Sequence, residues 1–382
     1  MLFKGTQKRT QHQLELEVEN MGAMLNAYTS REQTVYYSKC FSKDVGHSVE
    51  ILSDLLLNPT LSPQAIDVER NVILREMQEV NDQPEEVVLD YLHATAYQGS
   101  SLGYTILGPA ENIKSITEAD LRNYITTNYT APRIVLAGAG GVDHDELVGF
   151  AQEHFGGLSS ESSVVDASPA LFVGSEIKAR DDSAPMAHIA LSVEGCSWTD
   201  PDYFPLMVAN SIVGSWDRSF GGGANMASRL AQRATAENLA TSYMSFHTSY
   251  SDTGLWGCYG VVPENKVDDF VWAVQDEWMM LSGSVSESEV ERAKNQLKAS
   301  MLFQNDGTTA VCDEIGRQML TYGRRMYAAE LDARIEAIDV DTVKAVAKKY
   351  IYDNDPAVVG LGPIEQLPEY VRIRAQQWEV LQ

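Results

Sequence analysis

The chain has 382 residues, of which 44% are hydrophobic and 22% are charged, the composition of an ordinary globular protein. Its net charge of −25 lacks the basic footprint that nucleic-acid binding requires. No apolar run reaches the roughly 18 residues of a membrane-spanning helix. The four widely spaced cysteines exclude a CxxC pair and indicate neither a disulfide framework nor a thiolate metal site.

The first half of the chain predicts a set of strands and helices. Residues 34–39 are rich in aromatic and β-branched side chains, which is typical of a strand. Residues 45–57 show the apolar recurrence of an amphipathic helix. Leu61-Ser62-Pro63 opens another helix, which we expect to continue through residues 67–80. A further strand is predicted at residues 134–137.

A Ser- and Asp-rich stretch at residues 158–169 reads as a linker between two halves of the chain. We therefore expect an N-terminal domain at 1–158, a linker at 159–172 and a C-terminal domain at 173–382.

The second half repeats the order of the first. Residues 29–34 and 248–253 both read Thr-Ser-x-x-x-Thr, 219 positions apart, and an aromatic strand follows each. An amphipathic helix comes next in both halves, and the Ile-x-x-Ile segment at 113–116 recurs at 335–338, 222 positions later. Several matches at nearly constant offset indicate an internal duplication. The sequence thus predicts an α+β fold of two homologous domains, each a mainly antiparallel sheet packed with helices.

Two glutamates of the predicted helix 67–80 are candidates for chemistry. Glu69 and Glu76 are seven residues apart and therefore lie on one face of the helix. The mostly apolar residues 71–74 between them predict burial, and a buried carboxylate needs a base or a metal as partner. The alternative is an ordinary exposed acid that pairs with Arg70 or Arg75.

A second acidic pair follows in the next helix, for which Pro84 suits the first turn. Glu86 and Asp90 are one turn apart, a spacing at which two carboxylates can hold one guanidinium. The alternative is a solvated helix face.

The histidines do not form a metal-binding pattern. His12 and Glu15 have the HxxE spacing, but Leu16 stands where an HxxEH motif needs its second histidine. We expect all seven to be isolated surface residues; they are His12, His47, His93, His144, His154, His188 and His247.

Several segments resemble the β type of the mitochondrial processing peptidase family, which belongs to the pitrilysin-like, inverted zinc peptidases. The resemblance runs from Met1 to about Tyr370. The segments are Phe3-Lys4-Gly5-Thr6, 19–23, 25–34, 72–77, 104–109, 252–257 and 316–325.

The resemblance implies a metallopeptidase that cleaves basic mitochondrial presequences. In the family, an HxxEH helix supplies two histidine ligands and the glutamate general base, immediately before a segment like Phe3–Thr6. The present sequence starts after that place, so we interpret it as truncated at its N-terminus and expect it to be inactive alone. Glu76 matches the third zinc ligand and Glu69 a supporting glutamate. Zinc is expected in the full-length enzyme, and none bound to this chain.

The resemblance also implies where a substrate binds. Phe3 matches a residue that lines the pocket just after the scissile bond, and Asn26 and Ala27 match the edge strand on which the substrate lies. Glu86 and Asp90 match the acids that hold an arginine near the cleavage site.

Three functions stay open at this point. The chain is a presequence peptidase subunit that also serves as a core subunit of respiratory complex III, a non-catalytic core subunit of that complex, or a module that binds cationic peptides. Implied partners are a homologous α-type subunit, other complex III subunits and basic presequence peptides. The implied location is the mitochondrial matrix or the matrix face of the inner membrane, without a transmembrane segment.

Overall fold

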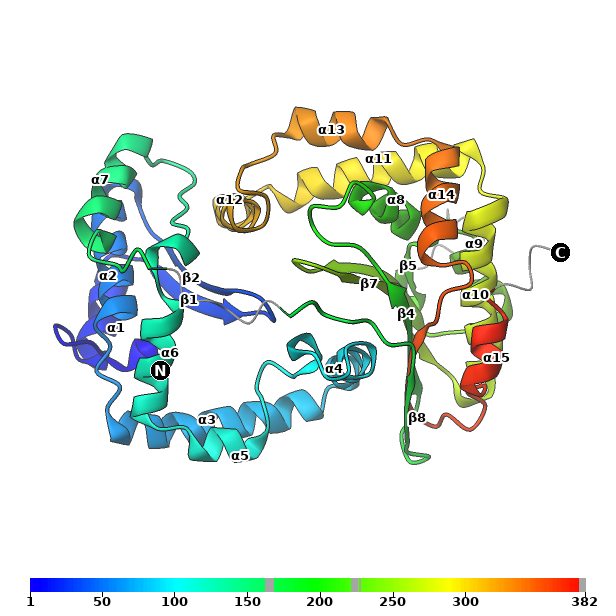
Figure 1. Cartoon of the computed structure of the whole chain (residues 1–382), viewed down its shortest axis with the longest axis horizontal. Coiled ribbons are helices and arrows are strands. Elements are labelled where there is room, and N and C mark those ends of the chain that lie inside the picture. The colour runs from blue at the N-terminus through cyan, green and yellow to red at the C-terminus, as the bar shows by residue number, and fades with distance from the viewer. Residues whose placement is uncertain (162–167, 221–225, 227, 378–382) are drawn as a thin grey trace. The chain divides into compact units, whose positions relative to one another are not determined.

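The computed structural model describes residues 1–161, 168–220, 226 and 228–377 of the chain. The main elements are the 3-10 helix η1 (Leu2–Lys4), α1 (Gln11–Asn20), β1 (Met24–Thr29), β2 (Thr34–Lys39), α2 (Val45–Leu57), α3 (Pro63–Asn81), α4 (Pro84–Ala96), α5 (Ala110–Ser115), α6 (Glu118–Asn128), α7 (His144–Phe155), β3 (Glu176–Arg180), β4 (Ala187–Glu194), α8 (Tyr203–Val213), β5 (Ser215–Asp217), α9 (Arg229–Glu237), β6 (Ser242–Ser249), β7 (Gly254–Val262), α10 (Val267–Gly283), α11 (Glu287–Gln304), α12 (Thr308–Tyr322), α13 (Ala328–Glu336), α14 (Val340–Tyr350), β8 (Ala357–Gly362) and α15 (Tyr370–Ala375) (Figure 1).

The chain packs into two compact units, and each is built from three separate stretches. Unit 1 comprises Met1–Glu79, Thr105–Ala167 and Gln304–Arg325. Unit 2 comprises Val80–Tyr104, Ser168–Phe303 and Met326–Gln382. The chain therefore passes from one unit to the other five times.

A six-stranded sheet forms the centre of unit 2. Its strands follow the order β3-β8-β4-β7-β6-β5, and every neighbouring pair is antiparallel except β3 and β8. The predicted α+β class with a mainly antiparallel sheet is confirmed here.

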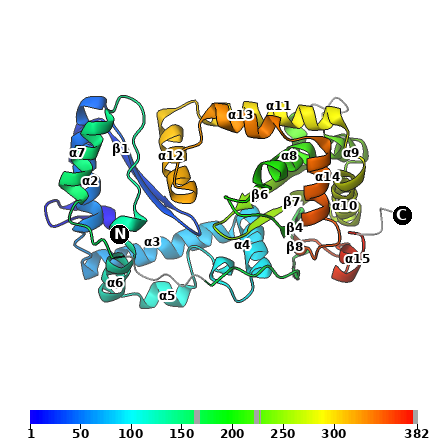
Figure 2. The same cartoon turned by 45° about the horizontal axis from the view of Figure 1, so that its top comes forward.

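Helices cover both faces of this sheet (Figure 2). Successive side chains of a strand point to opposite faces, so Leu255 and Trp256 of β7 lie on different sides. Trp256 is fully buried, and its indole N–H donates to the Leu206 carbonyl of α8 at 3.2 Å. Leu255 belongs instead to an apolar cluster with Val88 and Leu92 of α4. Helix α4 therefore covers the face opposite α8.

Helix α4 is held on the sheet by polar contacts as well as by apolar ones. The Tyr97 hydroxyl, just after α4, donates to the Gly254 carbonyl at 2.8 Å, and Tyr97 is fully buried. His93 Nε2 lies 2.5 Å from the Tyr250 hydroxyl, and Nδ1 lies 2.7 Å from the Leu89 carbonyl. The prediction that every histidine is a surface residue is wrong for His93, because its ring is a buried link between α4 and the sheet.

Unit 1 has a smaller described core. Strands β1 and β2 form a two-stranded antiparallel sheet. Leu14 of α1 packs with Ile51 and Leu55 of α2, and Phe3 and Leu25 border this cluster. On another side α2 approaches α7 closely, since a Cβ atom at Gly46 would lie 2.7 Å from the Phe150 ring.

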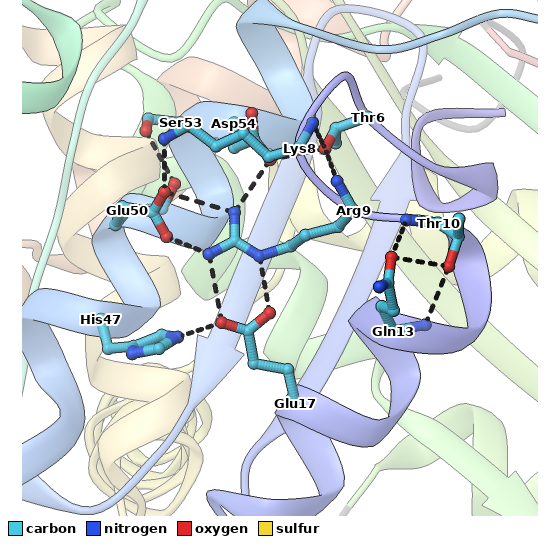
Figure 3. A network of polar contacts seen from close by, with 10 residues as sticks. All are labelled: Thr6, Lys8, Arg9, Thr10, Gln13, Glu17, His47, Glu50, Ser53 and Asp54. Carbon is cyan, nitrogen blue, oxygen red and sulfur yellow. Dashed lines mark hydrogen bonds and ion pairs between the residues drawn. The ribbon is translucent and has the colours of Figure 1, made fainter.

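One guanidinium connects the first elements of unit 1 (Figure 3). Arg9 donates from Nε and Nη2 to the two carboxylate oxygens of Glu17, at 2.6 and 3.1 Å. It also donates to both oxygens of Glu50 and, at 2.9 Å, to the buried carboxylate of Asp54. His47 Nε2 lies 2.6 Å from Glu17. We call these five residues the Arg9 cluster.

The internal duplication is confirmed by the order of the elements. The series α1-β1-β2-α2-α3-α4-α5-α6 corresponds to α9-β6-β7-α10-α11-α12-α13-α14, at offsets between 218 and 224 residues from the first residue of each element. Two members of this series are exchanged between the units. Helix α4 of the first half lies in unit 2, whereas its counterpart α12 lies in unit 1.

The predicted strand at 134–137 is wrong, because residues 134–139 have no regular structure. In unit 2 the corresponding strand β8 lies between β3 and β4. The described part of unit 1 offers residues 134–139 no such neighbours, and a strand needs partners for its backbone groups.

The division into domains at 158 and 173 stays a prediction. The two packing units are defined by contacts between residues, whereas the predicted domains are the two halves of the duplicated sequence. Residues 162–167 of the predicted linker lie outside the described residues.

The sequence predicts neither disulfide bonds nor membrane-spanning helices. All four cysteines are free, as predicted. None of the helices in the described ranges combines the length and apolar character that a membrane span requires.

We predict that Tyr97→Phe lowers the free energy of unfolding by about 1 kcal/mol, because it removes the buried hydrogen bond from α4 to the Gly254 carbonyl, which keeps only the bond from the Gly195 N–H. Urea unfolding measures the change. Tyr104→Phe is the control, since that ring is 71% exposed, and we expect it to be neutral. Equal values for the two variants would contradict the role of Tyr97 as an anchor of α4.

We predict that the Arg9 cluster makes unit 1 sensitive to acid. The hydrogen bond from Arg9 lowers the pKa of Glu17, and hydrogen bonds from Arg9 and Lys8 outweigh burial and lower the pKa of Glu50. A lowered folded-state pKa adds stability above the unfolded value near 4.5, and this stability is lost as the pH falls through the folded value.

Glu17→Gln should therefore cost about 1 kcal/mol at neutral pH, discounted for the partial exposure of Glu17, and little at about pH 3. Thermal unfolding from pH 7 to pH 3 measures this. Glu19→Gln, on the exposed side of the same helix, is the control. A Glu17→Gln effect that is independent of pH would contradict the assignment.

Candidate functional site

Helix α3 carries the two glutamates singled out in the sequence. Arg70 attaches the middle of α3 to α5 and the residue after it. It donates from Nε to the Ile113 carbonyl at 2.9 Å and from Nη2 to the Ile116 carbonyl at 2.5 Å. Glu69 and Glu76 are two turns apart, a rise of about 10 Å. They share a face of the helix, as predicted from their spacing.

Glu69 is partly buried, with 18% of its side chain exposed. Lys4 Nζ lies 3.3 Å from its Oε2 as an ion pair. Glu69 of α3 therefore contacts η1 through Lys4.

Glu76 is exposed, and it makes no hydrogen bond or ion pair with another described residue. The predicted burial of the segment around residues 71–74 is wrong, because Asn71 and Val72 are exposed as well. An apolar run shows which residues can be buried, but no described element covers this face of α3. Arg75 does not pair with either glutamate, since its Nε bonds the Asn71 carbonyl at 3.4 Å.

In the described ranges no three His, Cys, Asp or Glu side chains come together in a way that could hold a metal ion. A zinc ion takes at least three protein ligands, and Glu76 supplies one. The described residues alone therefore do not fit a zinc ion.

Asn26 and Ala27 lie on β1, as predicted. Strand β1 pairs with β2 along one edge, and no described strand pairs with its other edge. The Ala27 N–H donates to the side-chain oxygen of Asn26 at 2.8 Å, an acceptor that the carbonyl of an added strand would replace. An open edge of this kind can accept an extended peptide as an additional strand.

Phe3 lies at a cavity of about 340 Å³ next to β1. The cavity is lined by Phe3, Lys4, Gln11, Leu14, Glu15, Val18, Glu19 and Leu25. Its lining contains apolar side chains from η1, α1 and β1, so it has the chemistry to take an apolar side chain. We call it the Phe3 cavity.

Tyr36 contacts the Phe3 ring, and Tyr129 in turn contacts Tyr36. The Phe3 and Tyr36 rings meet edge to face, with centroids 6.4 Å apart. The Tyr36 hydroxyl lies 2.9 Å from the Tyr129 hydroxyl, and burial raises the pKa of both phenols. Both therefore stay protonated and can keep this hydrogen bond at neutral pH.

Glu86 and Asp90 belong to unit 2, because they lie on α4. Pro84 opens that helix, as predicted, and Glu85 and Glu86 occupy its first turn. Glu86 is exposed and Asp90 is half-buried, one turn further along. The two carboxylates share one face at the spacing that can hold a guanidinium.

The sequence did not indicate the residues that support Phe3 and α1, which are Arg9, Tyr36 and Tyr129. Arg9 follows Gln7 and Lys8 in the chain and has the sequence signature of an ordinary surface cation. Tyr36 and Tyr129 are 93 residues apart, and no local pattern links them.

Comparison with known proteins places the chain among characterised families. Residues 1–110 match the family model of insulinase (peptidase family M16), and residues 115–297 match that of the peptidase M16 inactive domain. The chain is 58% identical, over 98% of its length and 77% of the other protein, to mitochondrial-processing peptidase subunit beta of Homo sapiens. It is 50% identical to a probable mitochondrial-processing peptidase subunit beta of Arabidopsis thaliana, over 99% of this chain and 72% of that protein.

A solved structure is similar along most of the chain. A chain of complex III2 from Candida albicans with Inz-5 bound has a TM-score of 0.83 and 27% identity, and the match covers 94% of this chain and 86% of that one.

We predict that residues 1–382 alone take up no stoichiometric zinc, because a single exposed carboxylate cannot retain the ion. Equilibrium dialysis followed by elemental analysis measures the metal content. Glu76→Gln is the matched variant, and both chains should give the same background. A content near one zinc per chain that Glu76→Gln abolishes would contradict the prediction.

Proposed function

The chain belongs to peptidase family M16, and from this premise we propose that it is the β-type subunit of a mitochondrial processing peptidase. The similarity over 98% of the chain to β subunits of that enzyme carries the proposal. The reaction class is hydrolysis of a peptide bond in basic presequences.

The described residues support the peptide-binding part of this proposal. A peptide would add to the open edge of β1, where the Ala27 N–H and its neighbours supply backbone hydrogen bonds. One apolar side chain of that peptide would enter the Phe3 cavity of unit 1. Separately, Glu86 and Asp90 of unit 2 would hold an arginine of a basic presequence. A net charge of −25 favours basic peptides over acidic ones.

For the catalytic part, we assign Glu76 as one zinc ligand and Glu69 as a supporting carboxylate. The exposure of the Glu76 side chain leaves both of its oxygens accessible to an ion. A zinc ion held by Glu76 together with ligands from outside these residues would supply the Lewis-acid chemistry that peptide hydrolysis needs. The HxxEH motif that would complete the site is not present in these 382 residues.

The names of the relatives support a mitochondrial location, and we propose the matrix or the matrix face of the inner membrane. We further propose an α-type subunit as partner.

The alternative is a core subunit of complex III that has no catalytic activity. The similarity to a chain of the Candida albicans complex favours it, as does the lack of a metal-binding cluster in the described part of the chain. Isolation of the native subunit with its partner, followed by zinc analysis and an assay with an arginine-bearing presequence, separates the two. Zinc that depends on Glu76, together with turnover, supports the peptidase; a complex without zinc and turnover supports the alternative.

We predict that Glu86→Gln combined with Asp90→Asn weakens binding of an arginine-bearing presequence peptide by about tenfold or more, because charge-assisted hydrogen bonds contribute about 1.5–3 kcal/mol each. Fluorescence anisotropy at fixed salt measures the affinity. Replacement of the peptide's arginine by citrulline should cause a similar loss in the wild type and little further loss in the variant. Glu85→Gln, in the same helical turn, is the control; an equal loss there would show that only net charge matters.

A further inference from the structure

The Arg9 cluster lies where three elements of unit 1 meet (Figure 3). Arg9 is in the loop between η1 and α1, Glu17 is on α1, and Glu50 and Asp54 are on α2. The same loop is held by Thr6, whose hydroxyl donates to Asp54 at 2.6 Å and whose backbone N–H donates to the Arg9 carbonyl at 2.8 Å. One side chain therefore connects this loop to Glu17 of α1 and to Glu50 and Asp54 of α2.

Two of these elements form walls of the Phe3 cavity. Phe3 and Lys4 come from η1, and α1 contributes a larger share of the lining, including Leu14 and Val18. The volume of the cavity thus depends on the angle at which α1 leaves the loop. Arg9 lies in the loop of residues 5–10 that joins the two walls.

Apolar packing alone leaves that angle weakly determined. Leu14 is the one buried residue of α1, and it contacts Ile51 and Leu55, with the partly buried Val18 packed against the same cluster. Apolar contact of this limited extent is non-directional and fixes the helix less strictly than hydrogen bonds do. The guanidinium, in contrast, is planar and bonds both oxygens of Glu17 side by side, which fixes a direction as well as a distance.

We propose that Arg9 is a positioning residue that fixes the wall formed by α1 and so keeps the Phe3 cavity open for a bulky apolar side chain of a bound peptide. This inference rests on the proposed function, since it takes a peptide strand on β1 as the ligand. Arg9 itself does not line the cavity. It acts through Glu17 on one side and through Asp54 on the other.

The test compares two basic peptides that differ at one residue, Phe or Ala, C-terminal to the arginine. The readout is the ratio of their dissociation constants for the whole chain. In the wild type the Phe peptide should bind about tenfold tighter, which corresponds to partial burial of one aromatic side chain. Arg9→Lys keeps the positive charge but loses the planar group that donates two parallel hydrogen bonds to Glu17. In this variant the ratio of dissociation constants should fall to about threefold or less.

Glu17→Gln is a second variant, which releases α1 while the buried Asp54 stays paired with Arg9. It should lower the ratio in the same way, and it keeps the test decisive if Arg9→Lys does not fold. Lys8→Ala is the matched control, because Lys8 is in the same loop, bonds Glu50 from the exposed side and does not reach α1. Its ratio should equal that of the wild type. Affinity for the Ala peptide should change by less than about twofold in all three variants.

Two outcomes would overturn the inference: a wild type that does not distinguish the two peptides, or folded Arg9→Lys and Glu17→Gln variants with the wild-type ratio. A general loss of affinity for both peptides would also count against it, because it would indicate an unspecific structural effect. The proposed function is judged separately, by zinc and turnover in the native subunit. Absent turnover with a ratio that depends on Arg9 would overturn the peptidase and leave this inference standing.

Discussion

The packing of α4 on the six-stranded sheet is the interaction on which the organisation of the chain depends. Val88, Leu92 and Ala96 are fully buried there, and each large apolar side chain contributes about 1.5–3 kcal/mol when it is removed from water. The chain reaches α4 before the linker, yet the helix completes the unit formed mostly by residues after it. Because α12 lies in unit 1 in the same manner, each half of the duplicated chain supplies one helix to the other.

The first elements of unit 1 are held together largely by directional polar contacts, whereas the packing of α4 in unit 2 buries more apolar surface. Its main described apolar cluster contains three fully buried residues around Leu14. Asp54 is buried beside that cluster, and burial of an unpaired carboxylate would cost several kcal/mol, so Arg9 is required there. The same guanidinium, which bonds both oxygens of Glu17, then sets the direction of α1. Stability and the shape of the Phe3 cavity therefore depend on one side chain.

Local patterns predicted the elements whose signal is local. Residues 45–57 and 34–39 form a helix and a strand with the predicted bounds, because periodicity and β-branched residues act within a few positions. Residues 134–137 failed as a strand, since a strand depends on neighbours that may be far away in sequence. The predicted burial around Glu76 failed for a related reason, because an apolar run does not say what covers it.

The elements that carry several candidate residues were predictable from the sequence, whereas the roles of these residues stay predictions. Glu69 lies on the helix, and Asn26 and Ala27 on the strand, that the sequence indicated. The positions of Glu86 and Asp90 on α4 followed from the sequence, but their place in unit 2 depends on the exchange of helices. The role of Arg9 had no sequence signal, because it is defined by carboxylates 8, 41 and 45 residues away.

The exchange of α4 and α12 has a consequence for synthesis on the ribosome. Unit 1 includes residues 304–325, so its last element is translated 137 residues after Ala167 ends its second stretch. At roughly 5–20 residues per second, this interval lasts about 7–27 s. During that time the nascent first half exposes the surface that α12 will cover, and α4 has no complete sheet to pack on. The first half alone therefore cannot complete either unit.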